Sequence, residues 1–537
     1  MNTIKFEAGA SFPSVTKSNL DGSSRDLSKP LDGKDWQMLV VYRGRHCPLC
    51  TKFLNQLTEF KTRLDAINID LVAVSGDSKA QLKEHTSRLE VNFPLLYTPI
   101  PIAVAEASRW EHHWIVAATG HGKTQTLSSL ILDDLDRVKS KQCSLVVMDS
   151  NNKLINEIAR LAVFADGGDL AERLIIIDPQ DDLPLALNLF DIGIARFAEL
   201  PKPQQDKLYN TTIEIYEYIL AGLIGADMTQ KQGTLFRYVI RLLLIIPGAN
   251  IQTFLELMGD EAVKYKPYIE QLDGAARTFF DTHFFEGEFR RSRPEVHRRL
   301  LGLLSNTSFE DMFSARTNKL RLDRELDESK VILINTAKGH LGDEASRIFG
   351  RFFIGMIWQA TKQRFNDPEP HPTYVYIDEA VEYFDDHIGA LLRQARKSRI
   401  GLIMAHQDFE QVPENVLAAL RTNAAIRMAG GIESPQDLRK VTNTMGLDAD
   451  LVKSQPKASF ATSVRQGFSN TSIQFQLGRL SSEPTMTDEQ FTAIKRQMAR
   501  DYYYTPSQER DVPSSNATAQ TDDMHDPLAE TDPEEFF

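Results

Sequence analysis

The sequence predicts an α/β protein in which a parallel sheet is interrupted by an all-helical insertion. Three observations predict this class. Short apolar runs alternate with helical patterns over much of the chain, one such run leads into the glycine-rich stretch "AATGHGKT" ahead of a helix, and residues 195–325 carry helical patterns without strand signals. Alternation of this kind favours parallel strands covered by helices on both faces.

The first 98 residues predict a smaller α/β unit. Its patterns run strand, helix, strand, helix, strand through "QMLVVYRG", "CPLCTKFLNQLTEFKTRLDAI", "IDLVAVSGD", "SKAQLKEHTSRLEV" and "FPLLY". Three strands alone would leave an unpaired edge and an uncovered face. This unit is therefore expected either to dock on the rest of the chain or to be a remnant that shares no chemistry with it.

The larger unit begins after a junction, "TPIPIAVAEASRW", that contains two prolines. Strands are expected at Trp114–Ala118, in "CSLVVMDS" and in "RLIIIDPQ", and again after the insertion at Lys330–Ala337, Thr373–Ala380, Ile400–Gln407 and in "NAAIRMAG". The predicted division of the chain is a first unit, a core in two parts on either side of a helical insertion, and a disordered acidic tail: 1–98, 99–194, 195–325, 326–504 and 505–537.

Charge and cysteine content limit the possible functions. The 537 residues carry 61 Lys and Arg against 74 Asp and Glu, a net charge of −13, and much of the excess lies in the tail. This balance excludes a broadly basic nucleic-acid binder but allows a narrow basic channel. Three cysteines are too few for a disulfide framework, which favours a reducing, cytoplasmic location.

Neither a signal peptide nor a transmembrane segment is expected. The N-terminus "MNTIKFEAGASFPSV" lacks an apolar core of signal-peptide length. The most apolar internal run, "YVIRLLLIIPGANI", contains Arg241 and stops at Pro247, well short of the ~20 residues that a membrane span needs.

The stretch "AATGHGKT" between a strand and a helix predicts a P-loop that binds ATP and Mg²⁺. Gly120 and Gly122 let the backbone turn its N–H groups toward a phosphate at the positive end of the helix. Lys123 can reach the β- and γ-phosphates, and the Thr124 hydroxyl can bind magnesium. The common pattern begins with glycine, where this chain has alanine. The predicted nucleotide-binding residues are Ala117, Thr119, Gly120, His121, Gly122, Lys123, Thr124 and Gln125.

Two later strands end in polar residues that would complete an ATPase site. "TYVYIDEA" ends in Asp378, expected to hold magnesium, and Glu379, expected to polarise the attacking water. "IGLIMAHQ" ends in Gln407, which could contact the γ-phosphate or orient water. In an open parallel sheet these groups meet at the carboxyl edge, where ligands bind.

These stretches, with "RWEHHWIVAATGHGKTQTL" and "LLRQARKSRIGLIMAHQDFEQV", resemble the HerA/FtsK superfamily of RecA-like P-loop ATPases, and within it the coupling proteins of conjugative and type IV secretion systems. The resemblance covers about residues 101–500. It implies a homo-oligomeric ring, a hexamer, that translocates DNA or, in secretion ATPases, transfers protein. It also implies that Arg396 is an arginine finger, with Arg399 or Arg421 as substitutes.

Two further features bear on this resemblance. The insertion matches the family's all-α domain, and its cluster "RRSRPEVHRR" (Arg290 to Arg299) either faces DNA phosphates or is a solvated helix face. Coupling proteins usually begin with membrane-spanning helices, and none is expected here, which favours a soluble translocase or a mobile-element ATPase.

The N-terminal stretch "VVYRGRHCPLC", followed by an amphipathic helix and "LVAVSGDS", resembles a truncated peroxiredoxin-like member of the thioredoxin fold. The resemblance implies that Cys47 is a nucleophile at the first turn of a helix and Cys50 a resolving partner. Arg43 or Arg45 would supply the nearby cation. Peroxiredoxins usually have Thr or Ser where this chain has Gly44, which puts peroxidase activity in doubt.

The sequence thus leaves several functions to compare. The first is a ring-forming ATPase that moves DNA, and the second is a thiol oxidoreductase fused to a nucleotide-binding module. A secretion ATPase acting on protein and a scaffold that binds ATP without hydrolysis are further alternatives, although paired carboxylates such as Asp378 and Glu379 disfavour the scaffold. The acidic tail, "DDMHDPLAETDPEEFF", either docks on a protein partner or only solvates the chain.

Overall fold

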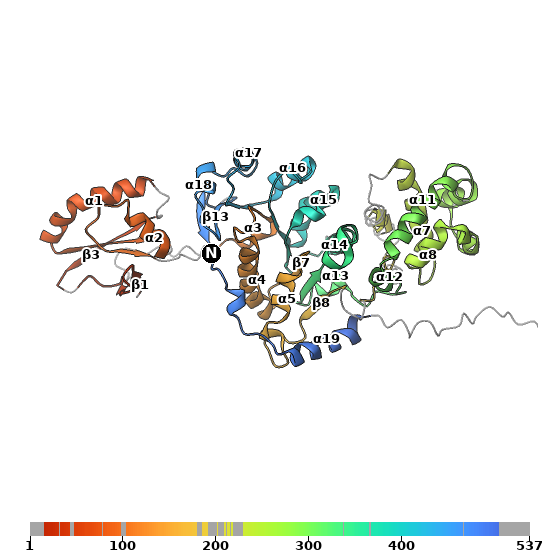
Figure 1. Cartoon of the computed structure of the whole chain (residues 1–537), viewed down its shortest axis with the longest axis horizontal. Helices are drawn as coiled ribbons and strands as arrows, with labels where there is room; N and C mark the ends of the chain where they lie inside the picture. Colours follow the sequence, from red (N-terminus) through yellow and green to blue (C-terminus); the bar gives the residue numbers. More distant parts are fainter. Residues whose placement is uncertain are drawn as a thin grey trace, which may run out of the picture.

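The computed structural model contains two β-sheets and a separate group of helices (Figure 1). It describes residues 15–31, 33–42, 48–77, 79–97, 104–179, 185–191, 201, 209–210, 212–214, 216–217, 229–336, 338–364, 367–465 and 467–503. The expected acidic tail, from residue 505 on, lies outside these residues.

The N-terminal sheet has five strands in the order β2-β1-β5-β4-β3. Their bounds are β1 Thr16–Asn19, β2 Ser24–Asp26, β3 Trp36–Tyr42, β4 Ile69–Ser75 and β5 Leu95–Tyr97. The expectation of three strands was therefore wrong. Strand β1 pairs antiparallel with both β2 and β5, while β3, β4 and β5 run parallel. The two additional strands are short and polar, so the sequence carried no apolar signal for them.

One face of this sheet is covered by helices α1 (Pro48–Ala66) and α2 (Lys79–Thr86). Leu54, Leu71 and Leu82 are fully buried between the helices and the sheet. On the opposite face a small cluster joins Val72, Val74 and Leu96 with Leu27. Strand β3 lies at the edge of the sheet, where Trp36 is 70% exposed and Val41 67% exposed.

The central sheet has nine strands in the order β14-β13-β12-β6-β11-β10-β7-β9-β8. Their bounds are β6 His113–Ala117, β7 Ser144–Asp149, β8 Leu174–Ile177, β9 Val331–Asn335, β10 Thr373–Ile377, β11 Ile400–His406, β12 Ile426–Gly430, β13 Ser459–Val464 and β14 Thr471–Gln474. Every strand expected from the sequence forms. From β12 to β8 all pairs are parallel, whereas β13 and β14 add an antiparallel edge that the sequence pattern did not reveal.

Helices cover both faces of the central sheet. Successive residues of β6 face opposite sides of the sheet. Trp114 and Val116 belong to one hydrophobic cluster, and Ile115 and Ala117 belong to the other. The helices of this unit are α3 Glu106–Trp110, α4 Lys123–Lys139, α5 Lys153–Ala159, α13 Leu322–Glu325, α14 Lys338–Gln363, α15 Asp386–Gln394, α16 Glu414–Asn423, α17 Pro435–Lys440, α18 Ala449–Lys453 and α19 Asp488–Tyr502.

The described part of the insertion contains helices joined by turns and no strand, as expected. Its helices are α7 Gln230–Leu243, α8 Ile251–Met258, α9 Lys266–Ile269, α10 Gly274–Phe279, α11 Gly287–Leu304 and α12 Thr307–Phe313, drawn in green shades in Figure 1. Aromatic rings fill its interior, for example Phe279 against Phe289 and Phe309 against Phe313. None of the helices that the structure describes, here or elsewhere, is long and apolar enough to cross a membrane.

Candidate nucleotide site

The predicted P-loop connects strand β6 to helix α4 at the carboxyl edge of the central sheet. Gly120 and Gly122 have positive φ angles of 76° and 112°, which side-chain-bearing residues rarely adopt. A Cβ on Gly122 would also lie 3.2 Å from the Cα of Ala458. Glycine is therefore required at position 122 both by the turn and by the close approach of the chain before β13.

The His121 side chain packs between the P-loop and strands β12 and β13. Its side chain is buried, its Nε2 lies 2.8 Å from the carbonyl oxygen of Ser459, and its ring packs edge-on against Phe460. A Cβ on Gly430 or Gly431 would collide with the imidazole, so these two glycines make room for it. Burial lowers the pKa of His121, which favours the neutral ring. The imidazole of this predicted nucleotide-binding residue thus fastens the P-loop to β12 and β13.

Lys123 and Thr124 open helix α4. The Lys123 ammonium is buried and donates to the carbonyl oxygens of Ala117 at 2.7 Å and Ala118 at 3.4 Å. Burial lowers the pKa of this lysine, and the carboxylates of Glu379 and Asp378 counteract that effect. The Thr124 hydroxyl donates to Asp378 at 2.8 Å. The sheet therefore brings together the P-loop lysine and threonine and the acidic pair that follows β10.

The acidic pair is held in an unusual backbone conformation. Glu379 has φ 51°, in the left-handed region, and its N–H donates to the Asp378 carboxylate at 3.1 Å. Burial raises the pKa of Asp378, and the nearby Asp149 adds to the shift, while the hydrogen bond from Thr124 opposes it. Burial also raises the pKa of Glu379. A carboxylate with a raised pKa is a better proton acceptor, as a general base requires.

Gln407 joins the P-loop to the candidate base. Its Oε1 accepts a hydrogen bond from the Thr119 hydroxyl at 2.5 Å, and its Nε2 donates to Glu379 Oε1 at 2.6 Å. The sequence placed Gln407 at the tip of the neighbouring strand without indicating either partner. The amide of Gln407 thus bridges the Thr119 hydroxyl of the P-loop and the carboxylate of Glu379.

Two polar residues at the same edge were not among the site residues predicted from the sequence. Asp149 ends β7 with 1% exposure and accepts hydrogen bonds from the N–H groups of Asn151 and Leu154. Lys338 lies at the start of α14, 3.0 Å from Glu382, and lines a cavity of about 260 Å³ with Glu379 and Gln407. The signal for Asp149 was present, because it ends a buried strand as Asp378 does.

Helix α4 is tied to the sheet by a buried polar network. Arg109 forms two hydrogen bonds of 2.6 Å with Asp134 of α4, and the Tyr376 hydroxyl of β10 donates to Asp134 at 2.6 Å. Asp134 is 1% exposed. Paired, hydrogen-bonded charges of this kind hold a fixed geometry, because separating them would leave a charge buried without its partner. The network fixes the helix whose first turn carries Lys123 and Thr124.

The predicted magnesium ligands fit a metal that is also held by phosphates. The Thr124 hydroxyl and the Asp378 carboxylate are adjacent oxygen donors, the type that magnesium prefers. Among the residues described, no group of three or more His, Cys, Asp or Glu side chains could hold a metal ion. Because magnesium usually keeps waters and substrate oxygens as ligands, two protein oxygens suffice when a nucleotide is bound.

Arg396 lies away from the site of its own chain. It belongs to the segment Ala395–Ser398, which precedes β11, and therefore sits at the amino edge of the sheet. Its side chain is 60% exposed, and its guanidinium lies 2.8 Å from the carboxylate of Glu111. Of its substitutes, Arg399 stacks on Trp110 and Arg421 lies in the last turn of α16. None of these arginines joins the P-loop within one chain.

The arginine cluster of α11 is not a uniform surface. Arg293 is buried, stacks on Phe284 and donates to the carbonyl oxygen of Leu257 at 3.3 Å. Arg290, Arg291 and Arg298 are exposed. At least one member of the cluster is thus structural, and only the others can face a phosphate backbone.

In the N-terminal unit, the described residues include Cys50 but not the predicted nucleophile. Cys50 is disulfide-bonded, and Cys143, in the central unit, is a buried free cysteine. Burial raises the pKa of Cys143 to about 12, so it remains a thiol. Cys47, Arg43, Gly44 and Arg45 lie outside the described residues.

With this geometry in place, comparison with known proteins identifies both folds. Residues 8–101 match the model of the AhpC/TSA family. The plasmid coupling protein TrwB, solved with the non-hydrolysable GTP analogue GDPNP, superposes with a TM-score of 0.52 at 13% identity, over 72% of this chain and 90% of its own. The larger part of the chain has the fold of a coupling protein.

A second structure of the bacterial conjugative coupling protein TrwB, unbound, gives a TM-score of 0.50 at 13% identity, over 71% of this chain and 88% of its own. VirB4 of Thermoanaerobacter pseudethanolicus gives a TM-score of 0.44 at 15% identity, over 68% of this chain and 90% of its own. No curated protein sequence matches the chain. The coupling-protein fold was the one that the P-loop and the "YVYIDEA" strand indicated, and the AhpC/TSA match agrees with the peroxiredoxin-like resemblance of the first unit.

Proposed function

We propose that the chain is an ATP-hydrolysing motor of the coupling-protein type that moves DNA. The observation that carries this proposal is the convergence of Lys123, Thr124, Asp378, Glu379 and Gln407 at one edge of the central sheet, where hydrogen bonds join the last four. TrwB, whose fold this chain shares, is solved with a nucleoside triphosphate analogue, which supports a nucleotide ligand here.

In the proposed reaction, the backbone of Gly120 and Gly122 and the Lys123 ammonium bind the phosphates. Magnesium, held by Thr124 and Asp378, would neutralise charge on the β- and γ-phosphates. Glu379 accepts a proton from the attacking water, and its raised pKa suits that role. Gln407 holds the Glu379 carboxylate until the loop is occupied.

The proposed assembly is a ring of identical subunits, a hexamer, working in the cytoplasm. The exposed position of Arg396 at the edge of the sheet opposite the P-loop supports an arginine finger that acts on a neighbouring subunit. Arginines supplied in trans stabilise charge on a transferring phosphoryl group. The exposed arginines of α11 are the proposed contacts to DNA phosphates, and the acidic tail is a proposed docking segment for a protein partner.

ATP hydrolysis by the full chain, with and without single- or double-stranded DNA, tests the proposal. We expect several-fold stimulation by DNA that is absent in Glu379→Gln and kept in Glu261→Gln, a matched change at an exposed residue of the helical insertion. Hydrolysis that DNA does not affect would point instead to a secretion ATPase acting on protein. Absence of hydrolysis in a chain that binds ATP would point to a scaffold.

A second candidate function belongs to the N-terminal unit. Its AhpC/TSA match and the disulfide at Cys50 support thiol-disulfide exchange, with Cys47 as the proposed nucleophile. Reduction of an insulin disulfide by the full chain, supplied with dithiothreitol, measures this activity. Loss in Cys47→Ser, with ATP hydrolysis intact, would support it, whereas a rate equal to dithiothreitol alone would exclude it.

A further inference from the structure

The chain after β14 returns to the P-loop. The Phe475 N–H donates to the carbonyl oxygen of Ala458 at 2.8 Å, and Ala458 is the residue that packs against Gly122. Three residues later, the Gly478 N–H donates to the side-chain oxygen of Gln125 at 2.8 Å. The segment 475–479, named here the return segment, is thus bound on one side to the chain beneath the loop and on the other to the first turn of α4.

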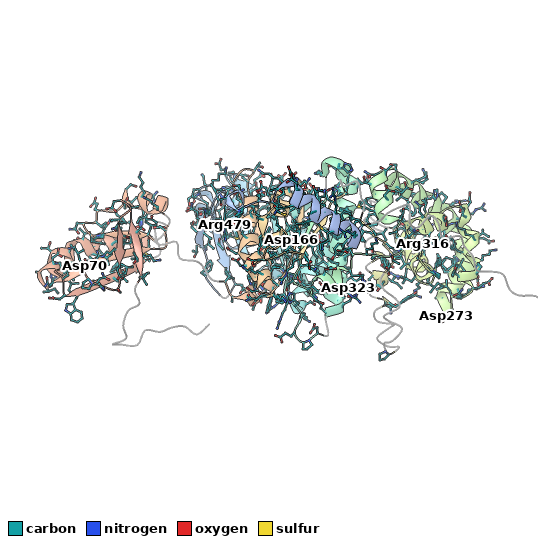
Figure 2. The ribbon with its side chains drawn as sticks, turned by 90° about the horizontal axis from the view of Figure 1, so that it is seen from below. Asp70, Asp166, Asp273, Arg316, Asp323 and Arg479 are labelled. Carbon is teal, nitrogen blue, oxygen red and sulfur yellow. The ribbon has the colours of Figure 1, made fainter. Side chains whose placement is uncertain are left out.

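The return segment is held in a defined turn. Gly478 has φ 70°, and its carbonyl oxygen accepts a hydrogen bond from the Ser481 hydroxyl at 2.9 Å. Arg479, labelled in Figure 2, lies 2.6 Å from Asp133 and also donates to the carbonyl oxygen of Ser129. Both Asp133 and Ser129 belong to α4, so the segment and the P-loop helix form one support.

Leu477 is the exposed apolar residue of this segment. Its side chain is 49% exposed, although the N–H groups of Phe475 and Gly478 on either side are bound to Ala458 and Gln125. The other large apolar side chains that are well exposed in the described chain belong to the N-terminal unit or the helical insertion. A single exposed leucine is ordinary on a protein surface. Its place matters here, because it is carried on a fixed turn beside the residue that follows Thr124.

We infer that Leu477 and the backbone turn at Gly478 form the platform for the purine base of the bound nucleotide. The inference rests on the proposed ATPase function and adds the base subsite to it. With the β- and γ-phosphates at Lys123 and Thr124, a nucleotide that lies along the first turn of α4 would bring its sugar and base to the return segment, which Gln125 holds. The flat apolar face of a purine packs on an aliphatic side chain and removes both from water.

The platform also indicates which nucleotides bind. Its contact with the base comes from an aliphatic side chain and from backbone whose Gly478 N–H is already used by Gln125. Apolar contact recognises the shape of a purine and not its exocyclic groups. ATP and GTP are therefore expected to bind within a few-fold of each other, and inorganic tripolyphosphate, which has no base, should be insensitive to changes at the platform.

The test is calorimetric binding of Mg²⁺ complexes of ATP, GTP and tripolyphosphate to the full chain. In Leu477→Asp, affinity for ATP and GTP should fall about tenfold, since a buried aliphatic contact is lost and a charge is placed under the base. Affinity for tripolyphosphate should stay within twofold. Leu477→Met, which keeps an apolar side chain of similar size, should restore nucleotide binding. Leu301→Asp, at a 47% exposed leucine of α11, is the matched control and should change nothing.

Two results would overturn the inference: unchanged ATP affinity in Leu477→Asp, or a parallel loss of tripolyphosphate, which would place the effect in the phosphate site or the fold. The proposed function fails separately. If the unaltered chain binds neither ATP nor tripolyphosphate, and Lys123→Ala changes nothing, the nucleotide site itself is wrong and the base subsite with it.

Discussion

The two sheets of the molecule differ in how completely they are covered. In the central sheet, strands β6, β7, β10 and β11 are buried along their whole length between two hydrophobic clusters. In the N-terminal sheet, helices cover one face, the second face has only the small cluster around Val72, and β3 consists of exposed and partly buried residues up to the buried Tyr42 at its end. Continuous burial is what makes a strand easy to recognise in a sequence and hard to perturb.

Both units nevertheless use the same local device. In each, a helix comes after a parallel strand and carries a candidate reactive side chain in its first turn, Lys123 in α4 and Cys50 in α1. The start of a helix attracts negative charge, whether a phosphate or a thiolate. The two units share this strand–helix arrangement, so the arrangement alone does not define the chemistry. In the central unit, the start of the helix is surrounded by carboxylates and by an amide that can position them.

The largest expected effect concerns hydrolysis in the central unit. Glu379→Gln removes the proposed base and should lower the rate of ATP hydrolysis about a thousandfold, while ATP still binds. Steady-state hydrolysis and calorimetric binding check the two parts. Thiol reactivity of the N-terminal unit should be unchanged. A mutant that hydrolyses ATP within threefold of the unaltered chain would show that Glu379 is not the base.

A matched pair of core substitutions tests whether the two units are independent. Leu71 in β4 and Leu145 in β7 are both fully buried. Replacement of either by alanine should lower the free energy of unfolding of its own unit by about 2 to 5 kcal/mol. Denaturant unfolding with and without ADP and Mg²⁺ separates the transitions, because a ligand stabilises only the unit that binds it. If Leu71→Ala weakened the nucleotide-stabilised transition, the units would be one cooperative body.

The pH dependence of hydrolysis should report the raised pKa of Glu379. The base works as a carboxylate, so the rate should fall about tenfold per pH unit once the pH is below that pKa. Because burial raises the pKa of Glu379, the rate should begin to fall at a pH above the ordinary pKa of an exposed glutamate, about 4.3. A rate profile measured over the stable pH range checks this. An acid limb at the ordinary glutamate value would contradict the assigned environment.

Substitutions at Gln407, which bridges Thr119 and Glu379, should have a smaller effect on the rate of ATP hydrolysis. Gln407→Ala removes a hydrogen bond to a charged group and is expected to slow hydrolysis about tenfold, with little change in the affinity for ATP. Gln407→Glu should be slower still, because it places a second carboxylate beside Glu379. Equal rates in all three proteins would mean that the bridge has no part in the reaction.

The smallest effect is expected at the open edge of the N-terminal sheet. Trp36→Lys should change the free energy of unfolding by less than about 0.5 kcal/mol, since the side chain is mostly in water. It should also reduce aggregation, because a charge on an edge strand opposes pairing with another chain. Denaturant unfolding and light scattering measure the two effects. A loss above about 1.5 kcal/mol would show that this face is covered after all.

The sequence predicted the parts of the site whose signals are local. The P-loop residues Gly120 to Thr124 are close together in the sequence, and Asp378 directly follows a strand of buried residues. Their positions in the sequence were therefore enough to predict that they lie at one edge of the sheet. The partners that hold them come from distant segments. Ala458 beneath Gly122, Ser459 at His121 and Thr119 at Gln407 are contacts across hundreds of residues, and periodicity along the chain carries no signal for such pairs.

The fold shows the same limit. Strands buried on both faces were found, whereas β1 and β2, with the sequences "TKSN" and "SRD", contain no apolar run. The hairpin of β13 and β14 was missed because its outer strand is partly exposed and polar. Arg293 is the buried arginine of the α11 cluster because it packs on Phe284 and donates to a carbonyl group of α8. The pattern of charges along α11 contains no information about these contacts.

Strand β6, which carries the P-loop, lies between β11 and β12, so that Trp114 pairs with Met404 on one side and with Arg427 on the other. Both neighbours are translated only after the whole helical insertion. A growing chain therefore exposes two open edges of an apolar strand for most of its synthesis. Folds with such distant contacts form slowly and aggregate easily before they close. The nucleotide site can appear only when residue 430 has left the ribosome.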